Sequence, residues 1–248
     1  MLAGAASSRG MDVTVVAPSF DASGSSAAMT AVSRDGKVVV DAISEDGGAP
    51  VYSVQGPPAF IVRAAMFGAF GPPPDVVLAG VNRGLNTGRA ILHSGTVGAA
   101  LTAATYGRRG LAVSAEVEDD DSWVPDCPVV SSALDWLEQV PQATVLNVNL
   151  PAAGRGGRRG VRTTTLAEAG TVQGRMSEAA GGFVSVVFTD SGTYPGEGTD
   201  AAALADGYVS VTAIRAVTED NRVNLAPIVG SPATVRAEGR AEGGRPGA

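Results

Sequence analysis

The chain has 248 residues, enough to bury one full-sized core. Its 44% hydrophobic and 17% charged residues are typical of a globular rather than a disordered protein. A formal net charge of −7 argues against a nucleic-acid polymer or a membrane as the main partner, although a local pocket with a cation can still bind a phosphate ester. The single cysteine, Cys127, excludes an intrachain disulfide and a thiolate metal cluster. With no apolar run near the roughly 18 residues of a membrane span and no signal-peptide pattern, we expect a cytoplasmic protein.

The first 151 residues alternate between strand-like and helix-like segments. Short apolar runs predict strands over 13–17, 37–40, 51–54, 76–79, 111–114 and 144–150, and helical spacing predicts helices over 59–70, 95–106 and 129–140. This alternation predicts an α/β fold, a Rossmann-like and mostly parallel sheet with helices on both faces.

The pattern changes after Pro151. A basic, glycine-rich turn is followed by apolar runs over 161–165, 183–188 and 208–214, which predict a hairpin-rich extension over about 155–216. We therefore expect one domain over 1–216 and a C-terminal segment over 217–248. This segment has no apolar periodicity from about residue 237 and is expected to be disordered there.

A loop rich in glycine and asparagine, GVNRGLNTG, follows the predicted strand 76–79. The amide oxygens of Asn82 and Asn86 are good ligands for a hard cation, and the glycines let the backbone approach a ligand closely. Taken alone, the loop fits an ordinary connection between a strand and a helix equally well.

The next segment, HSGTVGAA, opens the predicted helix 95–106. Ser94 or Thr96 can cap this helix, and the free N–H groups of Gly95, Thr96 and Val97 would then favour an anion. An ordinary helix cap is the simpler explanation of this segment by itself. His93 is the only histidine, and a lone histidine is more often a hydrogen-bonded loop residue than a catalytic base.

A third segment, VVAPSFDASGSS, brings Ser23 to the carboxyl end of the predicted strand 13–17. Its hydroxyl could bind a metal ion, although a serine-rich helix start is the simpler interpretation. Asp21 is the only carboxylate close by in the sequence, and its loop would have to redirect it toward the strand end.

These segments, with LNVNLP at 146–151 and GTDAAALADGYVSVTAI at 198–214, resemble in order the motifs of the SurE family of metal-dependent phosphatases, the 5′/3′-nucleotidases. The resemblance extends to about residue 216. It implies a phosphatase of nucleoside 5′- or 3′-monophosphates and a homo-oligomer, a dimer or a tetramer. It also implies a divalent ion, Mg²⁺ or Mn²⁺, bound by Ser23 and Asn82. Ser94, Gly95 and Thr96 would hold the phosphate, and Asn86 and His93 are candidate substrate-binding residues.

The chain departs from the family pattern in its carboxylates. The leading motif ILxTNDDG, with two adjacent aspartates, is absent, and Arg89 and Ala90 replace a second acidic pair. We expect that roughly 20 residues precede Met1, because a βαβ unit needs a strand and a crossover of at least a dozen residues. We also expect weak ion binding and little turnover without those aspartates, so the catalytic residues stay unknown. A non-catalytic nucleotide- or phosphate-binding protein and an inactive fragment are the alternatives.

Overall fold

The structure is a computed structural model that describes residues 1–31, 33–44, 48–117, 128–152, 157–169, 172–179, 183–190, 196–220 and 222, with only the backbone over 172–179 and 183–190. The chain divides into two compact units, Met1–Ala216 and Val217–Ala248. The expectations for Cys127 and for the segment from residue 237 lie outside the described residues.

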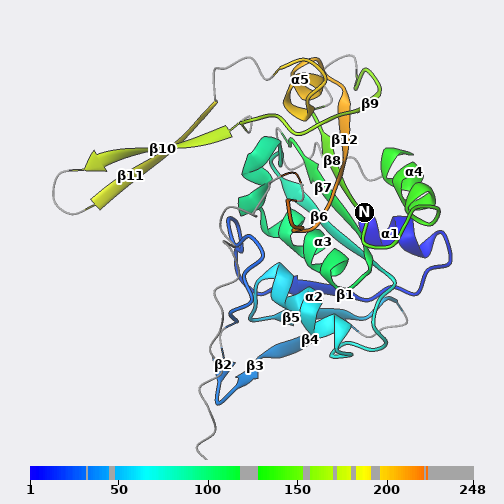
Figure 1. Ribbon diagram of the computed structural model, residues 1–248. Helices are drawn as coiled ribbons and strands as arrows, with labels where there is room; N and C mark the ends of the chain where they lie inside the picture. Colours follow the sequence, from blue (N-terminus) through cyan, green and yellow to red (C-terminus); the bar gives the residue numbers. More distant parts are fainter. Residues whose placement is uncertain are drawn as a thin grey trace, which may run out of the picture. The chain divides into compact units, whose positions relative to one another are not determined.

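The main sheet of the first unit has five strands in the order β6-β7-β8-β12-β9 (Figure 1). The three parallel strands are β6 (Val76–Arg83), β7 (Arg109–Ala115) and β8 (Val145–Leu150). β12 (Val209–Ile214) runs antiparallel to β8, and β9 (Val161–Thr163) runs parallel to β12. Every residue of β8 is buried, as expected for a central strand covered on both faces.

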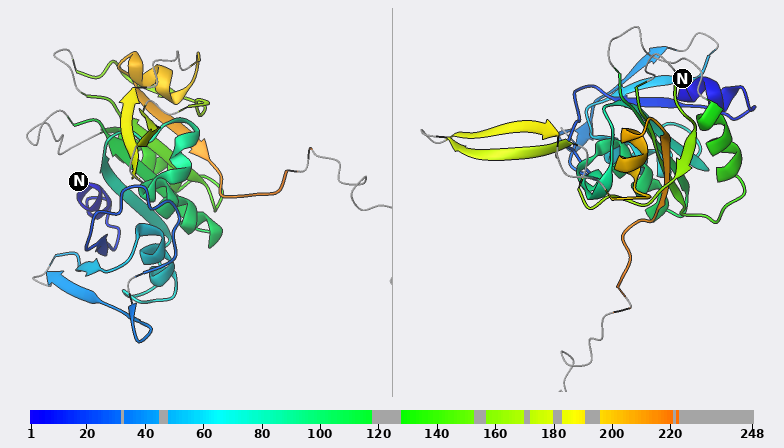
Figure 2. Two further views of the ribbon diagram at one scale, coloured as in Figure 1. Left: turned by 90° about the vertical axis from the view of Figure 1, so that its left-hand side faces the viewer. Right: turned by 90° about the horizontal axis from the view of Figure 1, so that it is seen from above.

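One face of this sheet is covered by α1 (Leu2–Ser7) and α4 (Pro128–Leu137) (Figure 2). The hydrophobic core on this face is formed by aliphatic side chains of the two helices and of the sheet. They include Leu2, Leu111, Val113, Leu134, Leu137 and Val148. Arg9, just after α1, donates to Asp135 of α4 at 2.8 Å, which ties the two helices together.

The opposite face is covered by α3 (Gly95–Thr105), a helix of small residues, with α2 (Pro58–Met66) packed against it. Ala112 and Val145 contact α3, whereas their neighbours in the strands face α4. This alternation is the two-residue period of a strand, and it places Asn147 and Asn149 on the α3 face.

A second, three-stranded sheet has the order β1-β5-β4. β1 (Val15–Pro18) is parallel to β5 (Val51–Val54), and β4 (Val40–Ser44) is antiparallel to it. β2 (Ser33–Arg34) and β3 (Lys37–Val38) form a separate small ribbon. Within the described part of the chain, β1 pairs only with β5 and β6 only with β7. Each of these two strands therefore has one unpaired edge.

The range 155–216, expected as a hairpin-rich extension, contains one antiparallel ribbon and two strands of the main sheet. β9 and β12 belong to the main sheet, and only β10 (Val172–Ala179) and β11 (Phe183–Asp190) form an antiparallel ribbon. The short α5 (Asp200–Ala205) was not predicted, because six residues are too few to show a helical period. Among the described residues, every helix is too short or too polar to cross a membrane.

Candidate functional site

The candidate site begins at the amino end of α3. The 3-10 helix η1 (Gly88–His93) leads into Ser94, which caps α3. The Ser94 hydroxyl accepts from the N–H of Val97 at 3.2 Å, and its carbonyl accepts from Gly98 at 2.8 Å. The N–H groups of Gly95 and Thr96 then have no acceptor within the helix. Together with the positive end of the helix dipole, they favour an anion such as phosphate.

Two glycines allow the segment 22–27 to lie directly on this helix end. A Cβ atom on Gly95 would lie 2.6 Å from the Ser25 hydroxyl and 3.1 Å from the Ala22 carbonyl, and one on Gly98 would collide with the Ser26 carbonyl. Ser26 also donates its N–H to the His93 carbonyl at 3.1 Å. The structure therefore brings together two segments that are about 70 residues apart in the sequence.

Ser23, predicted as a metal ligand, lies in this segment and is exposed. Its hydroxyl and its N–H both donate to Asp21 Oδ1, at 2.6 and 2.9 Å. The hydroxyl bond, followed by the backbone bond, lowers the pKa of the Asp21 carboxyl below its usual value. Asp21 is therefore an ionised carboxylate beside Ser23 at neutral pH.

Ser25 is a site residue that sequence reasoning missed. Its hydroxyl oxygen is buried and has no hydrogen-bond partner among the described residues. It lies against Gly95, at the helix end just described. A buried hydroxyl without a partner is costly, so this group is available for a ligand. The signal in the sequence was only a serine-rich run, in which nothing distinguishes Ser25 from Ser23.

Asn82 lies near the carboxyl end of β6 and is half-buried. Its side-chain nitrogen donates to the carbonyls of Gly84 and Arg83, at 2.8 and 3.2 Å. These bonds fix the carboxamide by its nitrogen and leave the Oδ1 atom for another partner. This oxygen is the atom that a cation would use.

The two predicted substrate-binding residues differ in their surroundings. Asn86 is bound into the protein: its N–H donates to Asn149 Oδ1 at 2.7 Å, and its side-chain nitrogen donates to the Ser114 hydroxyl at 2.6 Å. His93 is exposed at the end of η1. A substrate role for either residue stays a prediction.

The donor set offers little to a divalent ion. The described residues contain no group of three or more His, Cys, Asp or Glu side chains that could hold a metal. Asp21 is the carboxylate that the structure places against Ser23. Mg²⁺ is usually held by one or two carboxylates together with substrate phosphates. The described side chains therefore do not complete an ion site by themselves.

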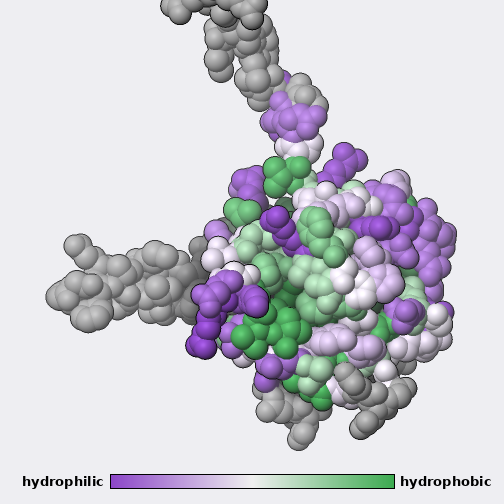
Figure 3. Space-filling model, turned by 90° about the horizontal axis from the view of Figure 1, so that it is seen from below, coloured by the Kyte–Doolittle hydropathy of each residue, from purple (hydrophilic) through white to green (hydrophobic). Residues whose placement is uncertain are grey.

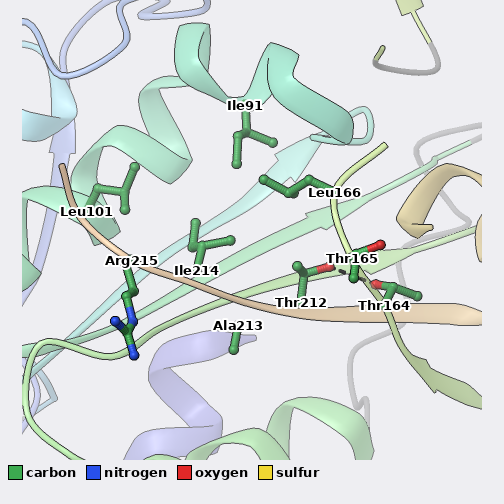
Figure 4. Close-up of a pocket in the computed structure, with 9 residues that line it drawn as sticks. All are labelled: Ile91, Leu101, Thr164, Thr165, Leu166, Thr212, Ala213, Ile214 and Arg215. Carbon is green, nitrogen blue, oxygen red and sulfur yellow. Dashed lines mark hydrogen bonds between the residues drawn. The ribbon is translucent and has the colours of Figure 1, made fainter. Parts of the chain in front are cut away.

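A surface cavity of about 390 Å³ lies elsewhere on the α3 face and does not include any of these residues. In Figure 4, Ile91, Leu166 and Ile214 point toward one another across it, and Arg215 points away. We place the candidate site at the end of α3 and not in this cavity, because most of the cavity lining is apolar and it includes none of the candidate residues described above.

The chain is similar to known proteins over most of its length. The family model described as survival protein SurE matches residues 1–173. The 5′-nucleotidase SurE of Thermoanaerobacter sp. (strain X514) is 32% identical over 229 residues, covering 86% of this chain and 85% of that protein. The 5′-nucleotidase SurE of Syntrophobacter fumaroxidans is 34% identical over 214 residues and 82% of each chain.

A solved structure shows a similar fold. The crystal structure of the SurE protein from Aquifex aeolicus superposes with a TM-score of 0.69 and 27% identity, and covers 90% of this chain and 89% of that chain. The predicted Rossmann-like α/β fold is confirmed by this likeness and by the mostly parallel sheet.

Proposed function

Because the chain belongs to the SurE family, we propose that it is a 5′-nucleotidase that hydrolyses nucleoside monophosphates to nucleosides and phosphate. The observation that carries the proposal is the amino end of α3, where the N–H groups of Gly95 and Thr96 meet the Ser25 hydroxyl, none of them with a partner among the described residues. A dependence on Mg²⁺ or Mn²⁺, a cytoplasmic location and a homo-oligomer also belong to this proposal.

The residues at this end of α3 would bind and orient the phosphoryl group. The N–H groups of Gly95 and Thr96 would donate to its oxygens, and the Ser94 cap fixes this end of the helix before the substrate arrives. Such fixed donors stabilise charge that develops on the phosphoryl oxygens in the transition state. The Ser25 hydroxyl would supply a further hydrogen bond from the opposite segment.

Two variants test this assignment in an assay of phosphate release from AMP. Thr96→Val keeps the backbone N–H group and removes the side-chain hydroxyl at this helix end, and it should slow turnover by about 10-fold, since a hydrogen bond to a charged group contributes about 1.5 kcal/mol or more. Thr102→Val is the matched control, because its hydroxyl bonds only to the Gly98 carbonyl inside α3. Equal effects of the two changes would contradict the placement of the phosphate at the helix end.

Asn82→Ala tests whether Asn82 is a ligand of the divalent ion. The change should raise the concentration of Mn²⁺ needed for half-maximal rate. In the unmodified protein we expect this concentration to lie in the millimolar range (about 10⁻³ M), because the site has one carboxylate. An unchanged metal titration would show that Asn82 is not a ligand.

A second candidate function is nucleotide binding without turnover. The lack of a carboxylate cluster in the described residues favours it, because the phosphate pocket does not depend on such a cluster. Calorimetric binding of AMP, with no phosphate release at any Mn²⁺ concentration, would select this function over hydrolysis.

A further inference from the structure

Asp200 is a fully buried carboxylate at the start of α5. Its Oδ2 accepts from the Gly88 N–H at 2.8 Å, and its Oδ1 accepts from the N–H groups of Ala167 and Ala201 at 2.9 and 2.8 Å. One carboxylate thus joins three chain segments. Hydrogen bonds from backbone N–H groups to an ionised carboxylate are stronger than those to a neutral acceptor.

The loop 84–88, which ends at Gly88, is also held by side chains of β8. Asn147 and Asn149 both donate their side-chain nitrogens to the Asn86 carbonyl, at 2.9 and 2.8 Å. Asn149 Oδ1 also accepts from the Asn86 N–H at 2.7 Å. The two asparagines can share this task because residues two apart in a strand point to the same face.

The loop 84–88 is therefore fixed at two points, Asn86 and Gly88. It connects Asn82, the candidate ion ligand, to η1, and η1 ends at the Ser94 cap of the phosphate site. The chain between Asn82 and the phosphate site is thus held by side chains of β8 and α5. These side chains are part of neither the ion site nor the phosphate site. This gives a role to the sequence motifs LNVNLP and GTD, which the proposed function leaves unused.

We propose that Asp200 is a positioning residue of the active site, with Asn149 as its counterpart on the other side of the loop. The inference rests on the proposed function. Asp200 sets the position of Gly88 and hence the distance between Asn82 and the amino end of α3. A displacement of about 1 Å at a reacting group can slow catalysis by 100-fold.

Asp200→Asn tests the inference while conserving the shape of the side chain. It turns one accepting oxygen into an NH₂ group that faces a backbone N–H, so at least one of the three hydrogen bonds is lost. Asp206→Asn is the matched control. It makes the same chemical change at the other end of α5, where Asp206 is exposed and bonded to Arg162.

Two readouts are needed, amide hydrogen exchange over 84–93 and the kinetics of AMP hydrolysis. Asp200→Asn should speed exchange in 84–93 while β7 and β8 stay protected, and it should lower kcat by about 10- to 100-fold with a smaller change in KM. Asp206→Asn should change neither. Unchanged exchange over 84–93, or an unchanged kcat in an active enzyme, would overturn the inference.

The exchange readout keeps the two proposals separable. If the unmodified protein releases no phosphate, the proposed function fails, but exchange still reports whether Asp200 holds the loop. If Asp200→Asn does not fold, Asn149→Ser should produce the same local loosening from the other side. A Gly88 amide that exchanges in the unmodified protein as fast as an exposed loop amide would overturn the inference without any variant.

Discussion

The Ser25 hydroxyl illustrates how a single atom connects stability to binding. It is buried without a partner in the described structure, and such a group typically costs about 1–3 kcal/mol. A ligand that accepts from this hydroxyl would remove the cost.

We therefore expect Ser25→Ala to leave the ligand-free protein as stable as before, or more stable. The same change should weaken binding of inorganic phosphate, by about 10-fold if one hydrogen bond is lost. Thermal unfolding and a calorimetric phosphate titration measure the two effects. A destabilised variant with unchanged phosphate affinity would show that Ser25 has a structural role only.

For single residues, the sequence predicted which residue types form the candidate site better than it predicted their contacts. Ser94 was expected as a possible cap and the structure confirms that it caps α3. Asn86 was a candidate substrate-binding residue, and the sequence did not indicate that three of its polar groups bond to β7 and β8. These contacts join residues 28 to 63 positions apart, which no local pattern in the sequence can indicate.

At the scale of elements, the site depends on the contact between α3 and the segment 22–27. Glycine is normally unfavourable inside a helix, by about 1 kcal/mol relative to alanine. Gly98 is placed there nevertheless, because a Cβ atom would collide with the Ser26 carbonyl.

Gly98→Ala should consequently lower the free energy of unfolding and weaken phosphate binding, against the usual helix preference. Gly4→Ala in α1 is the matched control, since a Cβ atom there has no neighbour within 4 Å and the change should be neutral or stabilising. Chemical unfolding of both variants measures the change in the free energy of unfolding. Stabilisation by both changes would show that the segment 22–27 does not lie on α3.

The elements themselves were predicted where a local pattern was strong. The helix expected over 95–106 is α3, and the strand expected over 144–150 is β8, each within a residue. The place of β9 and β12 in the main sheet was not predicted, because the membership of a strand in a sheet is set by its partners. β12 pairs with β8, some 60 residues away in the sequence, and its own residues do not reveal this.

At the scale of the whole molecule, the unpaired edges of β1 and β6 stand out. An exposed strand edge is a template for pairing with other chains. Large apolar side chains are also exposed, among them Ile43, Phe67 and Leu92. Figure 3 shows apolar residues gathered near the middle of the face seen from below, with hydrophilic residues around them.

We predict that residues 1–248 associate in a concentration-dependent way through these edges, measured by light scattering. Ala17→Lys places a charge at an exposed position of β1 and should reduce association, because edge lysines oppose strand pairing. Ala28→Lys adds the same charge outside the strand and should have less effect. Equal effects of both changes would point to net charge, not the edge, as the cause.

The most direct test of the account is AMP hydrolysis by the full chain, followed as phosphate release at increasing Mn²⁺ and repeated with EDTA. We predict that AMP binds, that phosphate release is slow and requires millimolar Mn²⁺ (about 10⁻³ M), and that EDTA abolishes it. The absence of both AMP binding and phosphate release at saturating Mn²⁺ would contradict the account.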